Sequence, residues 1–162
     1  MADPVGYEVR VAQPGDDVQL DAFLRGVGFG GLADSLYVDD HWIYQVYVAL
    51  SATHAVAGVL EGQIVYGSRY RPEQACRVFH LLVSPALRRT GVGTALMTRF
   101  AQDALAAERT SIVVGVDPRG PVEPRVAFFE SCGLSWTDRE QGFMGGDIQG
   151  LLQAVAGRRA QA

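Results

Sequence analysis

The stretch from Val78 to Leu96 constrains the fold more than any other part of the chain; it reads V-F-H-L-L-V-S-P-A-L-R-R-T-G-V-G-T-A-L. Its apolar start, Val78–Val83, predicts a strand that ends at the following Ser-Pro pair. Thr90–Thr94 then predicts the start of a helix, whose first turn has backbone N–H groups without helical partners and a partial positive charge. Two glycines in that turn let an oxyanion approach the backbone, and Arg88 and Arg89 add positive charge beside it. The stretch therefore predicts an anion-binding loop between a strand and a helix.

Two other phosphate-binding motifs do not fit these residues. A dinucleotide-binding G-x-G-x-x-G fingerprint needs a third glycine at the position of Leu96, and a P-loop needs a lysine, which the whole chain lacks. Gly26–Gly31 does match G-x-G-x-x-G, but it follows a predicted helix instead of a strand. We therefore interpret it as a loop between two helices. An ordinary strand-to-helix turn at Gly91 would leave the two arginines and Thr90 unexplained.

Strand, loop and helix together resemble the donor-binding motif of the GNAT superfamily of N-acetyltransferases, of the bacterial small-molecule type. The family signature is L-x-V-x-P followed by R/Q-x-x-G-x-G/A, and the matching residues are Leu81, Val83, Pro85, Arg88, Gly91 and Gly93. The resemblance implies acetyl-CoA as co-substrate, with the loop amides on the pyrophosphate of coenzyme A, and it implies no metal. The residues implied for donor binding are Leu81, Leu82, Val83, Arg88, Arg89, Thr90, Gly91, Val92, Gly93, Thr94 and, from a second motif, Phe128.

The second motif, Val116–Leu134, resembles a family signature that often reads D-P-x-x-N-x-x-A-x-x-F-Y-E-x-x-G-F. The matching residues are Asp117, Pro118, Phe128, Glu130 and Gly133. The usual asparagine falls near Val122 and the usual tyrosine falls on Phe129. A central-strand glutamate that some members use as a base falls on Arg77, which cannot accept a proton. The residues for proton transfer thus depart from the family pattern.

Three residues remain as candidates for the base that takes the proton of an attacking amine. Asp117 matches an aspartate that faces the acceptor amine in aminoglycoside-type members, and it equally fits a cap of the Pro-Gly turn behind it. His80 lies in an apolar strand, where a core histidine is the alternative. Glu61 lies in a predicted hairpin, where a surface carboxylate is the alternative.

The leaving thiolate and the oxyanion set two further requirements. Thiols have a pKa of about 8.5, so a thiolate can leave without an acid. Two residues are candidates for the proton donor that the missing tyrosine would supply: Cys132, which lies on the same predicted helix face as Phe129, and Ser131. Both also fit the alternative of small packed side chains. Backbone N–H groups near Leu82 or Val83 would stabilise the oxyanion. A polar group that could contact the acceptor, or lie in a solvated loop, comprises Asp34, Asp39, Asp40 and His41.

Periodicity predicts one mixed α/β sheet, and the resemblance implies that it is mostly antiparallel, splayed at a central strand and flanked by helices. The predicted strands cover residues 7–12, 46–52, 55–65, 77–84, 111–116 and 134–137, and the predicted helices cover 18–25, 91–108, 126–132 and 148–156. We expect the first helix to bury Val18, Ala22 and either Leu24 or Phe23. We also expect Gly145-Gly146 to break the chain, which leaves only residues 141–144 for a seventh strand and shortens the family's last hairpin.

Length and composition set the class of protein. The chain has 162 residues, 48% of them hydrophobic, and can bury a core as one domain, expected over residues 7–157 with tails at 1–6 and 158–162. Its net charge of −4 argues against nucleic acid as a partner. The 14 basic residues are all arginine, and the Ala/Arg/Gly/Val bias is typical of a GC-rich bacterial genome.

The cysteines and the apolar segments bear on location. Cys76 and Cys132 form no CxxC motif, so we expect reduced thiols. The sequence shows neither a signal peptide nor an apolar run of about 18 residues. A cytoplasmic protein with no membrane partner is therefore expected.

The function expected from the resemblance is transfer of an acetyl group from acetyl-CoA to the primary amine of a small molecule, by direct attack in a ternary complex. The alternative is a CoA-binding sensor or regulatory protein of the same fold with weak or no turnover. Acylation of a protein amine is less favoured, because no segment predicts a peptide groove. Family members often form homodimers, and that state stays open here.

Overall fold

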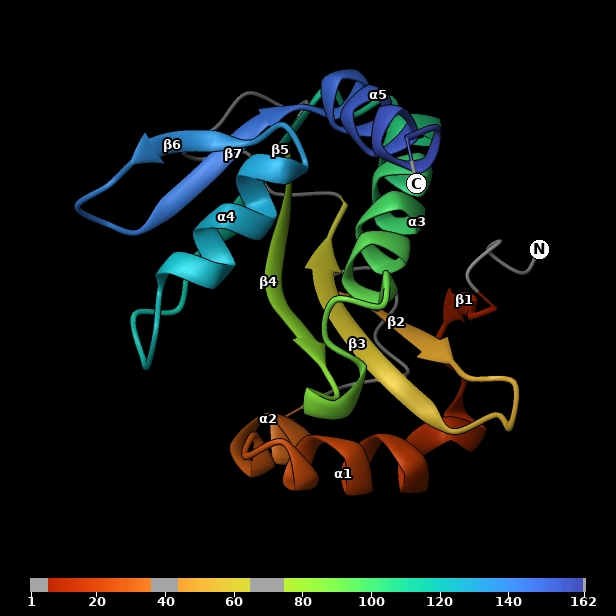
Figure 1. Cartoon of the computed structure of the whole chain (residues 1–162). Helices are drawn as coiled ribbons and strands as arrows, with labels where there is room; N and C mark the ends of the chain where they lie inside the picture. Colours follow the sequence, from red (N-terminus) through yellow and green to blue (C-terminus); the bar gives the residue numbers. More distant parts are fainter. Residues whose placement is uncertain (1–5, 36–43, 65–74, 162) are drawn as a thin grey trace. The chain divides into compact units, whose positions relative to one another are not determined.

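The computed structural model (Figure 1) describes residues 6–35, 44–64 and 75–161 of the chain. Seven strands form one sheet in the order β1-β2-β3-β4-β5-β7-β6, so the predicted mixed α/β fold is confirmed. The strands are β1 (Glu8–Val11), β2 (Gln45–Leu50), β3 (Val56–Gln63), β4 (Ala75–Val83), β5 (Ser111–Gly115), β6 (Ser135–Asp138) and β7 (Phe143–Asp147). The helices are α1 (Asp17–Gly26), α2 (Gly30–Ser35), α3 (Val92–Ala106), α4 (Glu123–Ser131) and α5 (Ile148–Arg159). No helix within these three ranges is long and apolar enough to cross a membrane.

The chain forms two compact units, and β4 and α3 each contribute residues to both. The first unit comprises residues 1–62 and 80–99, and the second comprises 63–79 and 100–162. The stripe predicted along α3, Val92, Leu96, Phe100 and Ala104, is buried over its whole length. Burial of every fourth residue explains why this helix was the most predictable element of the chain.

In the first unit, β1, β2 and β3 form an antiparallel meander. Val9 pairs with Ala49, and Val48 pairs with Val59. Buried side chains on this meander and on α1 form one apolar cluster: Ala12, Leu20, Val46, Val48, Leu50 and Val59. The start of β3, at Ala57 and Gly58, lies beside Leu82 and Ser84 at the end of β4, where the candidate site begins.

The buried face of α1 differs from the prediction. Leu20 and Leu24 are buried, whereas Val18 is 82% exposed and Ala22 is also exposed. Leu20 and Leu24 are four residues apart and so lie on one helix face, and they are larger than valine and alanine. Val18 lies two residues before Leu20, about 200° around the helix, and therefore faces solvent.

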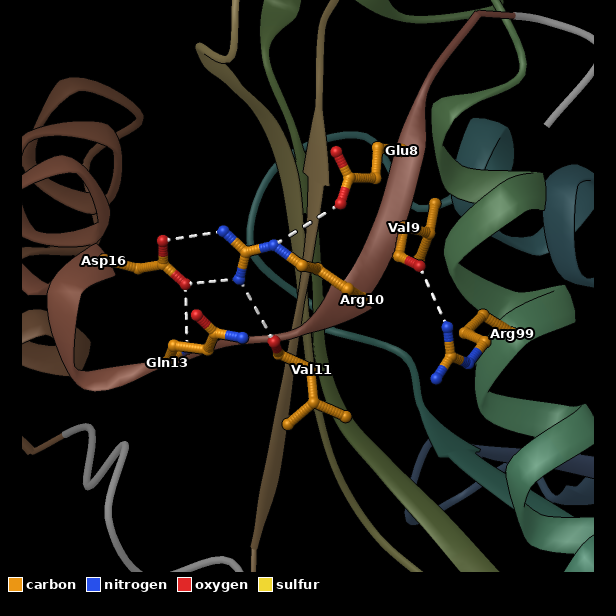
Figure 2. A network of polar contacts seen from close by, with 7 residues as sticks. All are labelled: Glu8, Val9, Arg10, Val11, Gln13, Asp16 and Arg99. Carbon is orange, nitrogen blue, oxygen red and sulfur yellow. Dashed lines mark hydrogen bonds and ion pairs between the residues drawn. The ribbon is translucent and has the colours of Figure 1, made fainter. Parts of the chain in front are cut away.

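A polar network ties β1 to the start of α1 (Figure 2). The Arg10 guanidinium donates to both carboxylate oxygens of Asp16, with N–O distances of 2.7 and 2.9 Å. The same carboxylate accepts the backbone N–H of Gln13 at 2.7 Å, and Arg99 on α3 donates to the carbonyl of Val9 at 3.0 Å. The hydrogen bonds from Arg10 lower the pKa of Asp16 from its ordinary value. The network fixes the turn through which β1 enters α1.

In the second unit, β4 pairs in parallel with β5 over Ala75–Val78, and β7 pairs antiparallel with both β5 and β6. β6 and β7 form the hairpin visible in Figure 1, and its second strand covers Phe143–Asp147, whereas residues 141–144 were expected. Gly145 and Gly146 do not break the chain but lie inside β7. A Cβ at Gly145 would come within 2.8 Å of the carbonyl oxygen of Ile112, so glycine is required there for close packing of β7 on β5.

The end of β7 leads directly into α5. The side chain of Asp147 accepts the backbone N–H of Gly150 at 2.7 Å, which makes Asp147 the N-cap of α5. α5 extends to Arg159, two residues beyond the expected domain end at 157. The placement of the domain boundaries stays a prediction.

Candidate functional site

The loop between β4 and α3 has the conformation of an anion cradle. After β4, the 3₁₀ turn Pro85–Leu87 is followed by Arg89 at φ +66° and Gly91 at φ +94°. Glycine adopts such angles at no steric cost, whereas Arg89 is held there at an expense of about 1–2 kcal/mol. The side chains of Arg88 and Arg89 are both exposed. The loop thus turns sharply into α3 while two guanidinium groups stay accessible.

The first turn of α3 supplies the amide donors. Ala95 N donates to Gly91 O at 2.9 Å, which is the first backbone hydrogen bond of the helix. The N–H groups of Val92, Gly93 and Thr94 precede that bond and so have no partner within α3. The positive end of the helix dipole adds to their attraction for an anion. These residues were predicted to bind the donor, and the structure brings them together in one turn.

Thr90 is held by a residue that the sequence did not indicate. Its hydroxyl donates to the carbonyl of Leu87 at 2.7 Å and lies 3.0 Å from the hydroxyl of Tyr7. Because the Thr90 proton is already used, Tyr7 must be the donor between the two hydroxyls. No local pattern connects residues 83 positions apart, so this support of the loop was not predictable.

The two predicted oxyanion donors on β4, the backbone N–H groups of Leu82 and Val83, point in opposite directions. Ser84 N donates to Ala57 O at 2.9 Å, so the residue after β4 faces the β3 side. Backbone groups alternate in direction along a strand, which turns Leu82 toward β3 and Leu81 and Val83 away from it. A Cβ at Gly58 on β3 would lie 2.9 Å from the Leu82 carbonyl oxygen, which agrees with that direction. Val83 and Leu81 therefore present their N–H groups on the edge of β4 opposite β3.

Two further candidates contact each other in the first unit. His80 Nδ1 lies 2.7 Å from Glu61 Oε2, across the adjacent strands β4 and β3. The side chain of His80 is 37% exposed and that of Glu61 is 14% exposed. The ring of Phe29, in the turn between α1 and α2, packs edge-on against His80 at a centroid distance of 6.2 Å. His80 is thus no core histidine, and Glu61 is no isolated surface carboxylate.

Asp117 lies in the second unit, and a neighbouring arginine holds its carboxylate. Arg119 donates through its side chain at 2.8 and 2.9 Å and through its backbone N–H at 2.9 Å. These bonds, the side-chain ones first, lower the pKa of Asp117 to about 2. Arg125 also donates to the Asp117 carbonyl at 2.8 Å. The arrangement matches the turn-capping interpretation of Asp117 and makes its carboxylate a poor proton acceptor at neutral pH.

Cys132 and Ser131 anchor α4 to α5. Arg158 donates to Ser131 Oγ at 2.6 Å and lies 3.7 Å from Cys132 Sγ. Cys132 is fully buried, and that burial raises the pKa of its thiol. Phe129, at the position of the family's tyrosine, is also buried, and Phe128 packs against it at a centroid distance of 5.4 Å. In the structure these side chains pack α4 into the second unit.

Arg77 occupies the position where some family members have a glutamate. Its guanidinium lies 4.6 Å from the ring centroid of Phe79 and 5.0 Å from that of Phe143. These cation–π contacts give Arg77 a packing role in the second unit. Among the expected acceptor residues, Asp34 pairs with Arg25 at 2.6 Å, while Asp39, Asp40 and His41 lie outside the described residues.

Comparisons with known proteins agree on the family. The model of the acetyltransferase (GNAT) family matches residues 22–134. The structure of a GNAT-family acetyltransferase from Staphylococcus aureus Mu50 has a TM-score of 0.70 at 10% identity and covers 88% of this chain and 99% of its own. The Escherichia coli N-acetyltransferase YhbS in complex with CoA has a TM-score of 0.69 at 18% identity and covers 93% and 88%.

A third structure, an AtaT mutant toxin bound to the C-terminus of the antitoxin AtaR and acetyl-CoA, has a TM-score of 0.62 at 14% identity. It covers 90% of this chain and 96% of its own. No curated protein matched the sequence. At these identities the structures establish the fold, and the family model covers well over half of the chain. The chain therefore belongs to the GNAT acetyltransferase family.

Proposed function

We propose that the protein transfers an acetyl group from acetyl-CoA to the primary amine of a small molecule, by direct attack in a ternary complex. The observation that carries this proposal is the loop between β4 and α3. Gly91 at φ +94° opens a helix turn whose first amides have no partner within α3, beside the exposed Arg88 and Arg89. The CoA and acetyl-CoA bound to the E. coli N-acetyltransferase and to the AtaT toxin support the same donor.

The loop fits the pyrophosphate of coenzyme A in charge and in shape. The N–H groups of Val92, Gly93 and Thr94 would donate to phosphate oxygens, and the glycine at 93 leaves room for their approach. Arg88 and Arg89 would pair with the remaining phosphate charge. At the acyl end, the N–H groups of Leu81 and Val83 would donate to the thioester oxygen as negative charge develops on it.

The reaction requires a neutral amine. Its nitrogen forms a bond to the thioester carbon, the tetrahedral oxyanion collapses, and the carbon–sulfur bond breaks to release the thiolate of CoA, while the nitrogen gives up one proton to become the amide. Because a thiol has a pKa of about 8.5, the thiolate can leave without a general acid. The buried phenyl ring of Phe129, which cannot donate a proton, is compatible with that chemistry.

Charge favours a cationic small-molecule acceptor. The chain carries a net charge of −4, and Glu61 lies on β3 beside His80. A protonated amine would be attracted to such a carboxylate. The proposal therefore favours alkylamines over neutral or acidic acceptors.

Calorimetry with acetyl-CoA and a thiol-release assay with a panel of amines test this function. We expect micromolar binding of acetyl-CoA, much weaker binding of acetyl-pantetheine, which lacks the pyrophosphate, and thiol release with at least one amine. Gly91→Ala should weaken acetyl-CoA binding by about 5- to 30-fold, if the strain of about 1–2 kcal/mol that alanine has at φ +94° is relieved by a shift of the loop. Gly157→Ala, in open space on α5, is the matched control and should bind normally.

Arg77 and Phe129 motivate a second candidate, a CoA-binding sensor without turnover, because neither can supply the base or acid that the family often has at these positions. Acetyl-CoA binding with no thiol release for any amine would support the sensor. Equal binding of acetyl-CoA and acetyl-pantetheine would contradict both candidates.

A further inference from the structure

The contact between Glu61 and His80 fixes the protonation pattern of the histidine ring. An ionised carboxylate can only accept hydrogen bonds, so Nδ1 at 2.7 Å from Glu61 Oε2 must carry the proton. In the neutral ring the other nitrogen, Nε2, then has a lone pair and can accept a proton. Glu61 thus holds His80 in the tautomer that a general base requires.

The difference in burial suits Glu61 to orient the histidine ring and His80 to contact a substrate. Glu61 is the more buried partner, at 14% exposed, and its carboxylate is used by His80. His80 keeps 37% of its side chain exposed, so the ring can meet a ligand from solvent. The rings of Phe29 and His80 form a T-shaped pair, with an angle of 74° between their planes. Glu61 therefore orients Nδ1 of His80, and the exposed part of the ring can contact a substrate.

The position of His80 along β4 suits proton transfer at the donor. His80 directly precedes Leu81, whose N–H lies on the edge of β4 away from β3, and the Cα atoms of adjacent residues are about 3.8 Å apart. The loop that would hold the pyrophosphate begins just after the same strand. Base, oxyanion donors and donor loop all belong to the first unit.

We propose that His80 is the catalytic base that takes the proton of the acceptor ammonium, and that Glu61 is the positioning residue that orients it. This inference rests on the proposed function. His80 Nε2 accepts a proton from the ammonium, and the Glu61 carboxylate stabilises the imidazolium. The neutral amine nitrogen then bonds to the thioester carbon and the carbon–sulfur bond breaks. The nitrogen loses its second proton to the departing thiolate, which leaves a neutral amide and a free thiol, and the imidazolium returns its proton to solvent.

Other ionisable groups are less suited to the role. Asp117 is held by Arg119, and Cys132 is fully buried beside Arg158. From the described elements that contact the His80 ring, β3 contributes Glu61 and the turn between α1 and α2 contributes Phe29, which has no charge. Glu61 is therefore the charged partner of the ring within the described part of the chain.

The test compares His80→Asn, Glu61→Gln and the matched control His54→Asn, with His80→Ala added for rescue by imidazole. His54 is exposed in the turn between β2 and β3 at φ +59°, a conformation that asparagine tolerates. Thiol release is measured with acetyl-CoA and a reactive alkylamine from pH 6 to pH 10, and donor affinity is measured by calorimetry. Thermal unfolding of each variant verifies that it folds.

At pH 7, His80→Asn should lower kcat by about 100-fold or more, with the affinity for acetyl-CoA unchanged. The deficit should shrink toward pH 10, because half of an alkylamine with a pKa of about 10 is then already neutral. Glu61→Gln should lower kcat by about tenfold with the same pH trend, and His54→Asn should match the wild type. Added imidazole should restore part of the rate of His80→Ala.

Three results would overturn the proposal. A His80→Asn rate above half of the wild-type rate at pH 7 would exclude His80 as the base while leaving the acetyltransferase activity established. A deficit of equal size at every pH, without rescue by imidazole, would show a structural role. Failure of the wild type to release thiol with any amine would refute the proposed function and this inference together, and that result is measured on the wild type alone, whereas the other two require a variant.

Discussion

Arginine–carboxylate pairs recur across this protein, and their surroundings decide what each contributes. Arg10 and Asp16 are mostly buried, with side chains 25% and 14% exposed, and they form two parallel hydrogen bonds. Arg119 and Asp117 form a similar pair, but Arg119 is 75% exposed. Exposed ion pairs contribute little to stability because water screens them. The Arg10–Asp16 pair is therefore the one to test for a structural role.

Asp16→Asn should lower the free energy of unfolding by about 1 kcal/mol at pH 7. The pKa of Asp16 is lowered in the folded protein, so its stabilising contribution is complete above the unfolded value of about 3.9 and is lost as the pH falls through the folded value. Urea unfolding at pH 7 and at pH 3 should show the difference between wild type and variant narrowing at the lower pH.

Asp17→Asn is the control, because Asp17 is exposed at the start of α1. It should cost only a few tenths of a kcal/mol through its interaction with the helix dipole. An equal loss for both variants would show that the Arg10–Asp16 pair stabilises no more than a surface charge does.

The contact between His80 and Glu61 could not be predicted from the sequence, although each residue could be named as a candidate. Each residue was a candidate base from its sequence context, and the structure adds that they bind each other across two strands. The pairing depends on how β3 and β4 are aligned, and no pattern within either strand encodes that alignment. The donor loop was predictable because Gly91 and its neighbours follow one another in the chain.

Helices and strands differ in how much of them could be predicted. The stripe of α3 repeats every fourth residue, so its extent was predicted nearly to the residue. β7 was not, because Phe143–Asp147 contains two glycines, which suggest a break when read alone. The reason for Gly145 lies in the neighbouring strand, where the Ile112 carbonyl leaves no room for a side chain. Close packing between strands therefore explains what local propensity could not.

Gly145→Ala should destabilise the protein by about 1–3 kcal/mol, because a Cβ 2.8 Å from the Ile112 carbonyl oxygen forces β7 away from β5. The same substitution at Gly157, in the last turns of α5 with open space around it, should instead stabilise by about 0.5–1 kcal/mol, since alanine favours a helix. Chemical denaturation of both variants measures the two changes. Equal effects of the same sign would show that propensity, and not the contact with Ile112, decides the outcome at position 145.

At the scale of the whole molecule, net charge and local charge oppose each other. The chain has 18 acidic residues and 14 arginines, so its long-range field repels an anionic donor such as acetyl-CoA. Binding must then come from short-range attraction at the loop, where Arg88 and Arg89 are exposed. The composition by itself gave no hint of an anion site, and only the position of these two arginines between a strand and a helix did.

The dependence of acetyl-CoA affinity on salt should distinguish the long-range repulsion by the net charge from the local attraction by Arg88 and Arg89. Wild-type affinity for acetyl-CoA should fall as salt rises, because the Debye length shrinks from about 10 Å at 0.1 M to about 3 Å at 1 M and weakens the arginine–phosphate pairs. In Arg88→Gln/Arg89→Gln the affinity should be lower at low salt, and it should stay level or rise with salt, since mainly the repulsive field remains to be screened.

The control, Arg25→Gln/Arg139→Gln, removes the same charge from exposed positions on α1 and after β6. It should keep the wild-type dependence on salt when calorimetry is repeated at four salt concentrations. If both double variants give the same slope, net charge alone governs donor binding, and the loop between β4 and α3 has no special part in holding the pyrophosphate. If only the loop variant loses the slope, the attraction is local, and a protein of net charge −4 holds its anionic donor through the placement of two arginines.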